Sequence, residues 1–363
     1  MTVMRATVCC PSELGPGEVR QWHSFQDATP AFQHPFLSPE LAQAAGAVHP
    51  GAKVAVVEQD GRIVGFLPFT ARRFGLALPI AERLVTSHAF VHAPDLTWSW
   101  GDVLGACGLA AFQASHLVAA QAGVSTGLRQ ATTPIIRVHR GWEAYLNAEG
   151  RGASKFFRTI AYKHRKLERE VGEVQLTTGS ATQEELAQLA GWKSRQYRRS
   201  GWPDPFARPG TRELLDVLAA ATGPYLAGVT TTLRAGGRLL SVDFSVRSRT
   251  IFACWFGSYD PACARYSPGA IRTLFMIEDA AASGVEYLDL CRGDEAYKDR
   301  LKTDEIPVAH GILARDTALG RLQRWQQAPR DALQTYILDH SRLRHAVRAT
   351  LRAAGAARVS LRG

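Results

Sequence analysis

Two segments of the chain share one pattern, in which apolar and polar residues alternate on both sides of a short turn. In residues 53–69 the turn is Asp60-Gly61, and in residues 230–244 it is Gly236-Gly237. Alternation with a period of two predicts strands, and such a turn between two strands predicts a hairpin. The repeat therefore predicts two tandem copies of one α/β unit, although two unrelated hairpins would show the same pattern.

Longer periods mark the helices, in which apolar residues recur every three to four positions. The run at 251–256 is apolar throughout, which is typical of a central strand. We predict a mixed α/β (α+β) fold with two units, each a central sheet flanked by helices. The expected domains are 1–132, 133–314 and a helical tail at 315–363. The expected helices are 17–28, 39–45, 103–115, 153–171, 183–199 and 211–221, and the expected strands are 6–10, 225–234, 239–246, 250–257 and 306–314.

Composition narrows the class of protein. Of the 363 residues, 46% are hydrophobic and 21% charged, which predicts globular domains. No apolar run is long enough to span a bilayer, and the first residues lack a signal-peptide core. The six cysteines show neither metal nor disulfide spacing, so we expect a cytoplasmic protein without a metal site.

The net charge of +10 is concentrated in the tail, which has ten Arg and three Asp from Leu313 onward. A charge confined to one terminal segment does not suit a nucleic-acid groove, so no nucleic-acid partner is expected. An Arg-rich helical tail is typical of a solvated face or of weak contact with the inner face of a membrane.

The turn Ser267-Pro268-Gly269 opens an apolar helix. Pro suits the first helical position, and the N–H groups of Gly269, Ala270 and Ile271 are then expected to be free. Free N–H groups at a helix N-terminus favour an anion such as a pyrophosphate. A strand at 287–290 follows the helix, so the polar residues after it gather near its carboxyl end. The first domain has no equivalent of these features and is expected to do no chemistry.

These motifs carry a family resemblance. The run YSPG, the helix after it, the segment YLDLCRGDEAYK at 287–298 and the turn at 235–238 resemble the GNAT-fold acyltransferases of the CelD-like group, which are related to the FemABX transferases. The resemblance covers most of 136–303 and, faintly, 18–130. The usual glycine-rich phosphate loop of the GNAT fold is absent, and the Ser-Pro-Gly turn stands in its place, as in the CelD-like group.

The resemblance implies the donor and its place. Acetyl-CoA or a longer acyl-CoA would lie in a gap between two central strands, with its pantetheine arm against strand 250–257. Trp255 and Phe256 on this strand, together with the Ser267 turn and the helix start, are the expected donor-binding residues. No covalent enzyme intermediate is required.

The resemblance also assigns Lys298 to the carbonyl end of the reaction, where it would stabilise the oxyanion. The alternative is a solvated lysine that pairs with Asp294 or Glu295.

Asp289 is the expected general base, because a carboxylate within an apolar strand is unfavourable unless it has hydrogen-bond partners or a catalytic role. It could equally stabilise the turn by accepting hydrogen bonds from the backbone N–H groups of Arg292 and Gly293. Tyr297 could protonate the leaving thiolate, or it could be a packing residue.

The segment 192–199 resembles the part of the group that faces the acceptor. Lys193, Gln196 and Tyr197 share one helix face and are expected to bind it, although a solvated basic helix would look the same.

We therefore predict an acyl-CoA-dependent N- or O-acyltransferase that acts directly on a small-molecule, glycan or peptide acceptor, in exopolysaccharide or envelope metabolism. The alternatives are a FemABX-like transferase that uses aminoacyl-tRNA and a non-catalytic scaffold at a membrane surface.

Overall fold

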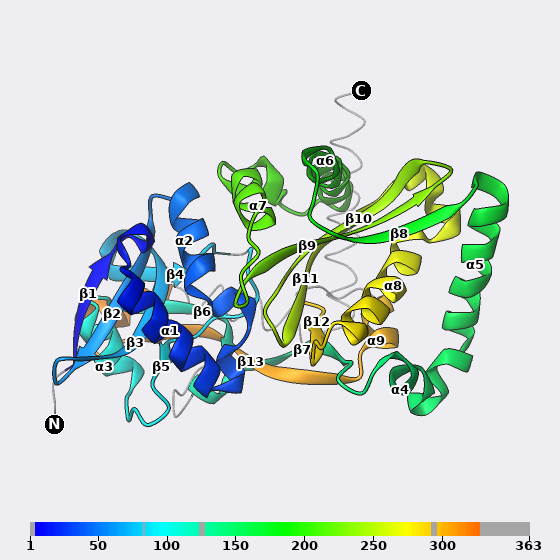
Figure 1. Cartoon of the computed structure of the whole chain (residues 1–363). Helices are drawn as coiled ribbons and strands as arrows, with labels where there is room; N and C mark the ends of the chain where they lie inside the picture. The colour runs from blue at the N-terminus through cyan, green and yellow to red at the C-terminus, as the bar shows by residue number, and fades with distance from the viewer. Residues whose placement is uncertain (1–3, 83, 123–127, 292–295, 327–363) are drawn as a thin grey trace. The chain divides into compact units, whose positions relative to one another are not determined.

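The computed structural model describes residues 4–82, 84–122, 128–291 and 296–326, which form two compact units (Figure 1). Unit 1 holds the described parts of Met1–Thr132, Ser200–Trp202 and Pro307–Gly363. Unit 2 holds Thr133–Arg199 and Pro203–Ile306, where described. The expected domain 133–314 is therefore not one unit, because residues 307–314 belong to unit 1.

Unit 1 is built on a mixed sheet in which neighbouring strands are antiparallel, except for the parallel pair β4 and β6. The strand order is β1 (Arg5–Cys9), β2 (Ala52–Gln59), β3 (Arg62–Ala71), β4 (Leu76–Pro79), β6 (Ala111–Val118) and β13 (Asp304–Ala314), and β5 (Val91–His92) adds to β3. The helices are α1 (Pro16–Ala28), α2 (Pro39–Val48) and α3 (Trp100–Ala106).

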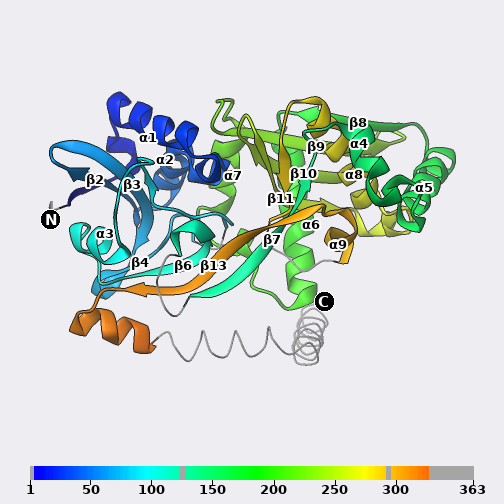
Figure 2. The ribbon, with the colours of Figure 1, turned by 90° about the horizontal axis from the view of Figure 1, so that it is seen from below.

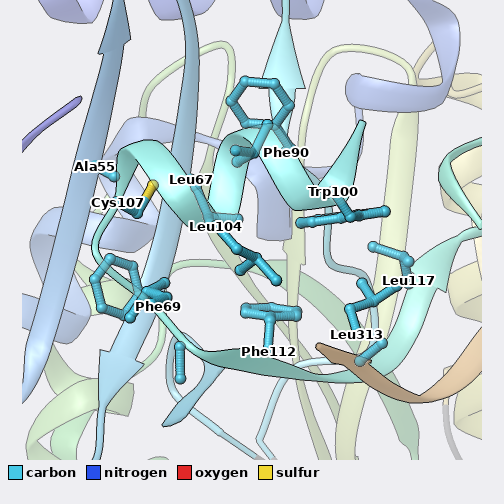
Figure 3. Close-up of a cluster of buried hydrophobic side chains, with 14 of the residues drawn as sticks. Ala55, Leu67, Phe69, Phe90, Trp100, Leu104, Cys107, Phe112, Leu117 and Leu313 are labelled. Carbon is cyan, nitrogen blue, oxygen red and sulfur yellow. The ribbon is translucent and has the colours of Figure 1, made fainter. Parts of the chain in front are cut away.

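The core of unit 1 lies between α3 and the sheet. Figure 3 shows Trp100 and Leu104 of the helix against Leu67, Phe112 and Leu313 of the strands, and all five are buried. The helix expected at 103–115 is wrong. α3 ends at Ala106, Gly108 takes a φ of +66°, and residues 111–118 form β6. A short apolar run is compatible with either a buried helix or a strand. Here residues 111–118 form a strand because they pair with β4 and β13.

Unit 2 has the same kind of sheet, again with one parallel pair, β11 and β12. The order is β8 (Val174–Gly179), β9 (Ala227–Ala235), β10 (Arg238–Arg247), β11 (Ile251–Tyr259), β12 (Tyr287–Asp289) and β7 (Arg129–Arg137). The helices are α4 (Trp142–Asn147), α5 (Lys155–Val171), α6 (Gln183–Ser200), α7 (Thr211–Ala219), α8 (Pro268–Ala282) and α9 (Ala296–Leu301).

The two units repeat one topology, which confirms the tandem architecture. Each has four antiparallel strands, a helix that leads to a parallel fifth strand, and an antiparallel sixth strand from a distant part of the chain. Both hairpin predictions are confirmed, since Asp60, Gly61, Gly236 and Gly237 all have positive φ, as a tight hairpin turn requires. The strand expected at 306–314 exists, but it pairs with β6 of unit 1.

Helices cover both faces of the unit 2 sheet (Figure 1). Leu233 of β9 packs among side chains of α5 and α8, including Leu167 and Ile271. The next residue, Arg234, points to the opposite face and binds Glu185 of α6 at 3.1 Å. α5 and α8 therefore lie on one face, and α6 lies on the other.

Candidate active site

The sheet of unit 2 opens between its two parallel strands. β11 and β12 pair over three residues only, and this pairing ends where Ala253 meets Asp289. β11 runs on to Tyr259. Among the described residues, this second half of β11 therefore has a sheet neighbour only in β10. An extended chain with amide groups could lie along such an edge and add hydrogen bonds to it.

A β-bulge begins where the two strands part. Val246 of β10 pairs with Ala253, and Phe244 pairs with Phe256, so Ser245 faces two residues on β11. A bulge bends the strand that carries the extra residue, which accounts for the divergence of β11 from β12. The two residues opposite Ser245 are Cys254 and Trp255, one of which is the extra residue of the bulge.

The two aromatic residues expected to bind the donor have different surroundings. Phe256 is buried, and its ring meets that of Phe206 at 5.0 Å between centroids. Trp255 is half-buried and stacks on Phe256. The side chain of Phe256 thus belongs to the core, so only its backbone faces the open edge.

Asp289 ends β12 as a buried carboxylate that already has donors. Its Oδ1 accepts a hydrogen bond from Thr133 Oγ1 at 2.9 Å and from the N–H of Cys291 at 2.7 Å. Cys291 has a φ of +55°, and the carboxylate holds this uncommon backbone conformation. Asp289 therefore shapes the turn after β12. The N–H groups of Arg292 and Gly293, expected to serve it, lie outside the described residues, as do Asp294 and Glu295.

Lys298 is buried beside this turn. Its side chain comes from α9, and its Nζ lies 3.4 Å from the carbonyl oxygen of Cys291. It is not the solvated surface lysine of the alternative interpretation. Tyr297, the preceding residue on α9, is 40% exposed. The structure thus buries Lys298 beside the turn that Asp289 supports and leaves Tyr297 partly exposed.

Cys254 on β11 lies close enough to Asp289 and Lys298 for their charges to affect its thiol. Burial raises the pKa of its thiol well above the ordinary value, and the carboxylates of Asp243 and Asp289 add to the increase, while Lys298 opposes it. The charges of Asp289 and Lys298 therefore act on Cys254 where β11 parts from β12. A thiol with such a raised pKa is a poor nucleophile, which fits direct transfer without an acyl-enzyme.

We expect Cys254 to resist alkylation. At pH 8 a raised pKa leaves almost no thiolate, so iodoacetamide should label Cys254 at least tenfold more slowly than an unfolded peptide of the same sequence. Peptide mass spectrometry of the native protein measures the rate. Cys107, whose pKa burial raises to about 12, is the matched buried control. Labelling of Cys254 at the peptide rate would contradict the assignment.

The start of α8 differs in part from the expectation. Ser267 takes a left-handed conformation, with φ +54°, and its carbonyl oxygen accepts the N–H groups of Ala270 at 3.0 Å and Ile271 at 3.2 Å. The prediction of three free N–H groups is therefore wrong, because two of them close the first turn of the helix. Among the described residues, the N–H of Gly269 donates to no protein oxygen.

A cation from α5 reinforces this end of α8. Lys163 donates from Nζ to Ser267 Oγ at 2.6 Å. Its ammonium charge therefore lies beside the N-terminus of α8, where the helix dipole is also positive. Together they place positive charge where sequence analysis expected backbone N–H groups alone.

Lys163→Met should weaken binding of CoA by about tenfold, because it removes one charge-assisted contact to an anion at the α8 start. Isothermal titration calorimetry with CoA measures the dissociation constant. Lys166→Met is the matched control, since Lys166 lies one turn along α5 and is paired with Glu170. Equal affinities in wild type and Lys163→Met would remove Lys163 from the donor site.

Helix α6, which is expected to bind the acceptor, contacts β11. Lys193 of α6 donates to the carbonyl oxygen of Gly257 on β11 at 3.1 Å, and its ammonium lies 5.6 Å from the ring centre of Tyr197. The shared helix face of these two residues is confirmed. Gln196 is exposed beside them. Their role in binding an acceptor stays a prediction.

A buried ion pair ties α8 to the diverging strand. Arg272 binds Asp243 Oδ2 at 3.0 Å, and both side chains are 6% exposed. Arg272 also donates to Ser241 Oγ and to the carbonyl oxygens of Val242 and Ser258. Only glycine fits at position 257, because a Cβ there would lie within 2.7 Å of both charged groups. The pair thus holds the helix start against β10 and β11.

Sequence reasoning missed three contributors to the site. Thr133 supports Asp289, Lys163 supports the α8 start, and Arg272 anchors α8. The one available signal was Arg272, a charge in an otherwise apolar stretch of helix. Thr133 and Lys163 have ordinary sequence surroundings, and only the fold brings them to their partners.

An opened parallel strand pair, a helix N-terminus with an added cation and a buried lysine all belong to unit 2. Residues 154–299 match the family described as Acetyltransferase (GNAT) domain. The match covers 146 of the 363 residues, so the chain is similar to GNAT acetyltransferase domains over that segment, and the protein is a transferase. No curated protein matches the sequence at a significant level.

Solved structures share the fold at low sequence identity. FemX has a TM-score of 0.53 at 10% identity and covers 81% of this chain and 94% of its own. A conserved protein from Bacteroides thetaiotaomicron has a TM-score of 0.54 at 11% identity, with 84% and 98% covered. The C-terminal domain of a protein described as a lysylphosphatidylglycerol synthetase from Agrobacterium fabrum has a TM-score of 0.51 at 11% identity, with 85% and 96% covered. These likenesses concern the fold.

The described residues contain no group of three or more His, Cys, Asp or Glu that could hold a metal ion. In the same part of the chain, no helix is both long and apolar enough to cross a membrane.

Proposed function

We propose that unit 2 is an acyl-CoA-dependent N- or O-acyltransferase of the CelD-like group, which transfers an acetyl or longer acyl group to a polar acceptor in exopolysaccharide or envelope metabolism. The observation that supports this most is the open half of β11, with Lys298 buried where the opening begins. The GNAT fold typically uses acyl-CoA, and the open edge fits the amides of a pantetheine arm. The α8 start and Lys163 would hold the diphosphate.

The reaction exchanges one bond for another at the thioester carbonyl. The acceptor nitrogen or oxygen forms a bond to the carbonyl carbon, and the carbon–sulfur bond then breaks. Lys298 would stabilise the negative charge that develops on the carbonyl oxygen. Asp289 would take the proton that the acceptor loses, and Tyr297 would supply a proton to the leaving thiolate. Lys193 and Tyr197, with Gln196, would contact the acceptor beside β11.

The experiment is a donor screen by thermal unfolding, followed by product detection. Acetyl-CoA at a hundred times its dissociation constant should stabilise the folded protein by about 2.7 kcal/mol. Incubation with labelled acetyl-CoA and fractions of a cell extract should then give free CoA and a labelled product, identified by its mass. Longer acyl-CoAs, acylated carrier protein and aminoacyl-tRNA are tested in parallel. Stabilisation by aminoacyl-tRNA alone would replace the proposal with the FemABX-like alternative.

A further inference from the structure

An unusual helix follows β13 at residues 318–326. Its inner side is small or polar. A Cβ on Gly320 would lie 2.2 Å from the carbonyl oxygen of Arg315, and Gln323 is 4% exposed. Its outer side carries Leu319, Leu322 and Trp325, which are 39%, 44% and 74% exposed. The apolar face of this helix therefore points away from its own unit.

A second exposed aromatic lies next to this helix. Phe74 precedes β4, is 74% exposed and has a φ of +59°, a conformation that costs energy for a bulky residue. Gln323 Nε2 donates to the carbonyl oxygen of Phe74 at 3.2 Å and so joins the two segments. Figure 2 shows the orange helix on the outside of unit 1 beside β4. Among the described large hydrophobic side chains, Phe74 and Trp325 have the highest exposed fractions.

Arginines flank these apolar side chains. Arg72 and Arg73 adjoin Phe74, and Arg321 and Arg324 lie on the helix. Two carboxylates offset them in part, since Glu82 pairs with Arg72 and Asp316 pairs with Arg321. The chain continues after this helix with seven Arg and two Asp in residues 327–363. The surface thus combines exposed Leu and aromatic residues with net positive charge.

We propose that Phe74, Leu319, Leu322 and Trp325, here called the apolar patch, dock unit 1 on the surface of an anionic phospholipid bilayer. Leu and aromatic side chains enter the headgroup region, where Trp in particular is favoured. The arginines that flank these side chains would bind lipid phosphates. Charge complementarity favours this occupant over a second copy of the chain, which would bring the same positive charge to the interface. The proposal does not depend on the transferase reaction.

Vesicle sedimentation with the full-length protein tests the proposal. Vesicles of equal phosphatidylglycerol and phosphatidylcholine should bind the protein, and pure phosphatidylcholine should bind it at least tenfold less. The variant Leu322→Ser with Trp325→Ser should lose at least tenfold in partitioning to the anionic vesicles. Arg321→Gln with Arg324→Gln should lose more than tenfold, at about fivefold for each charge.

Tyr162→Ser is the matched control, because Tyr162 is an exposed aromatic, at 54%, on α5 of unit 2. It should bind as the wild type does. Thermal unfolding confirms that each variant is folded. Unchanged binding of the Leu322 and Trp325 variant would overturn the proposal, since residues 327–363 would then suffice. Failure of the wild-type protein to bind the anionic vesicles would also overturn the proposal. So would a wild-type dimer that the Leu322→Ser and Trp325→Ser substitutions dissociate.

Discussion

Replacing Lys298 with Met is expected to lower the turnover number for acyl transfer by about 10²–10³-fold, while the dissociation constant for acetyl-CoA stays within about twofold. The ammonium is buried and lies 3.4 Å from the Cys291 carbonyl oxygen, at the point where β11 and β12 part. A donor in such a place acts on the charge that develops during reaction rather than on the bound thioester. Turnover is followed by release of free CoA, and affinity by calorimetry.

Lys302→Met supplies the control from the same end of α9. Lys302 is partly exposed and pairs with Asp299 at 2.9 Å and Glu305 at 2.6 Å, so its loss should leave turnover unchanged. Lys298→Arg keeps a positive charge and should recover part of the activity. Wild-type turnover in Lys298→Met, or an equal loss in Lys302→Met, would show that the buried lysine takes no part in the reaction.

Arg272→Met is expected to lower the free energy of unfolding by about 3–5 kcal/mol, because it leaves the Asp243 carboxylate buried without its cation. The double variant Arg272→Met with Asp243→Leu should be more stable than Arg272→Met alone. Removing both charges removes the cost of burying an unpaired one. Urea denaturation at pH 7 measures the free energy of each variant.

The control for the buried pair is Arg137→Met on β7. Arg137 and Asp304 are 48% and 47% exposed, so their pair should contribute less than about 1 kcal/mol. A loss of that size for Arg272→Met, or a double variant less stable than Arg272→Met, would mean that the pair is not what fixes α8 to β10 and β11.

Local patterns predicted the elements of the fold well. The Asp-Gly and Gly-Gly turns located both hairpins, and the apolar run at 251–256 located β11, since these signals depend on a few adjacent residues. The strand β6 was predicted as part of a helix, and the strand predicted at 306–314 was placed with residues 133–305, although residues 307–314 belong to unit 1. Both depend on which distant strands offer free edges, and no local pattern contains that information.

The candidate site shows the same division. Proline at 268 predicted where α8 begins, and the apolar context of Asp289 predicted that it would need partners. The free N–H groups were overestimated because Ser267 adopts a left-handed conformation and turns its own carbonyl onto two of them. Lys163 was unidentified because it approaches from another helix. Contacts between separate elements were the part that sequence could not supply.

Hydrogen–deuterium exchange with saturating acetyl-CoA tests the central claim most directly, that the open half of β11 and the start of α8 bind the donor. Peptides that cover residues 254–259 and 266–272 should exchange more slowly with the ligand, because the pantetheine arm would pair with β11 and the diphosphate would meet the N–H of Gly269. Peptides of β1 and β2 in unit 1 serve as the reference and should be unchanged. Protection confined to unit 1, or unchanged exchange at both segments while acetyl-CoA is bound, would contradict the account.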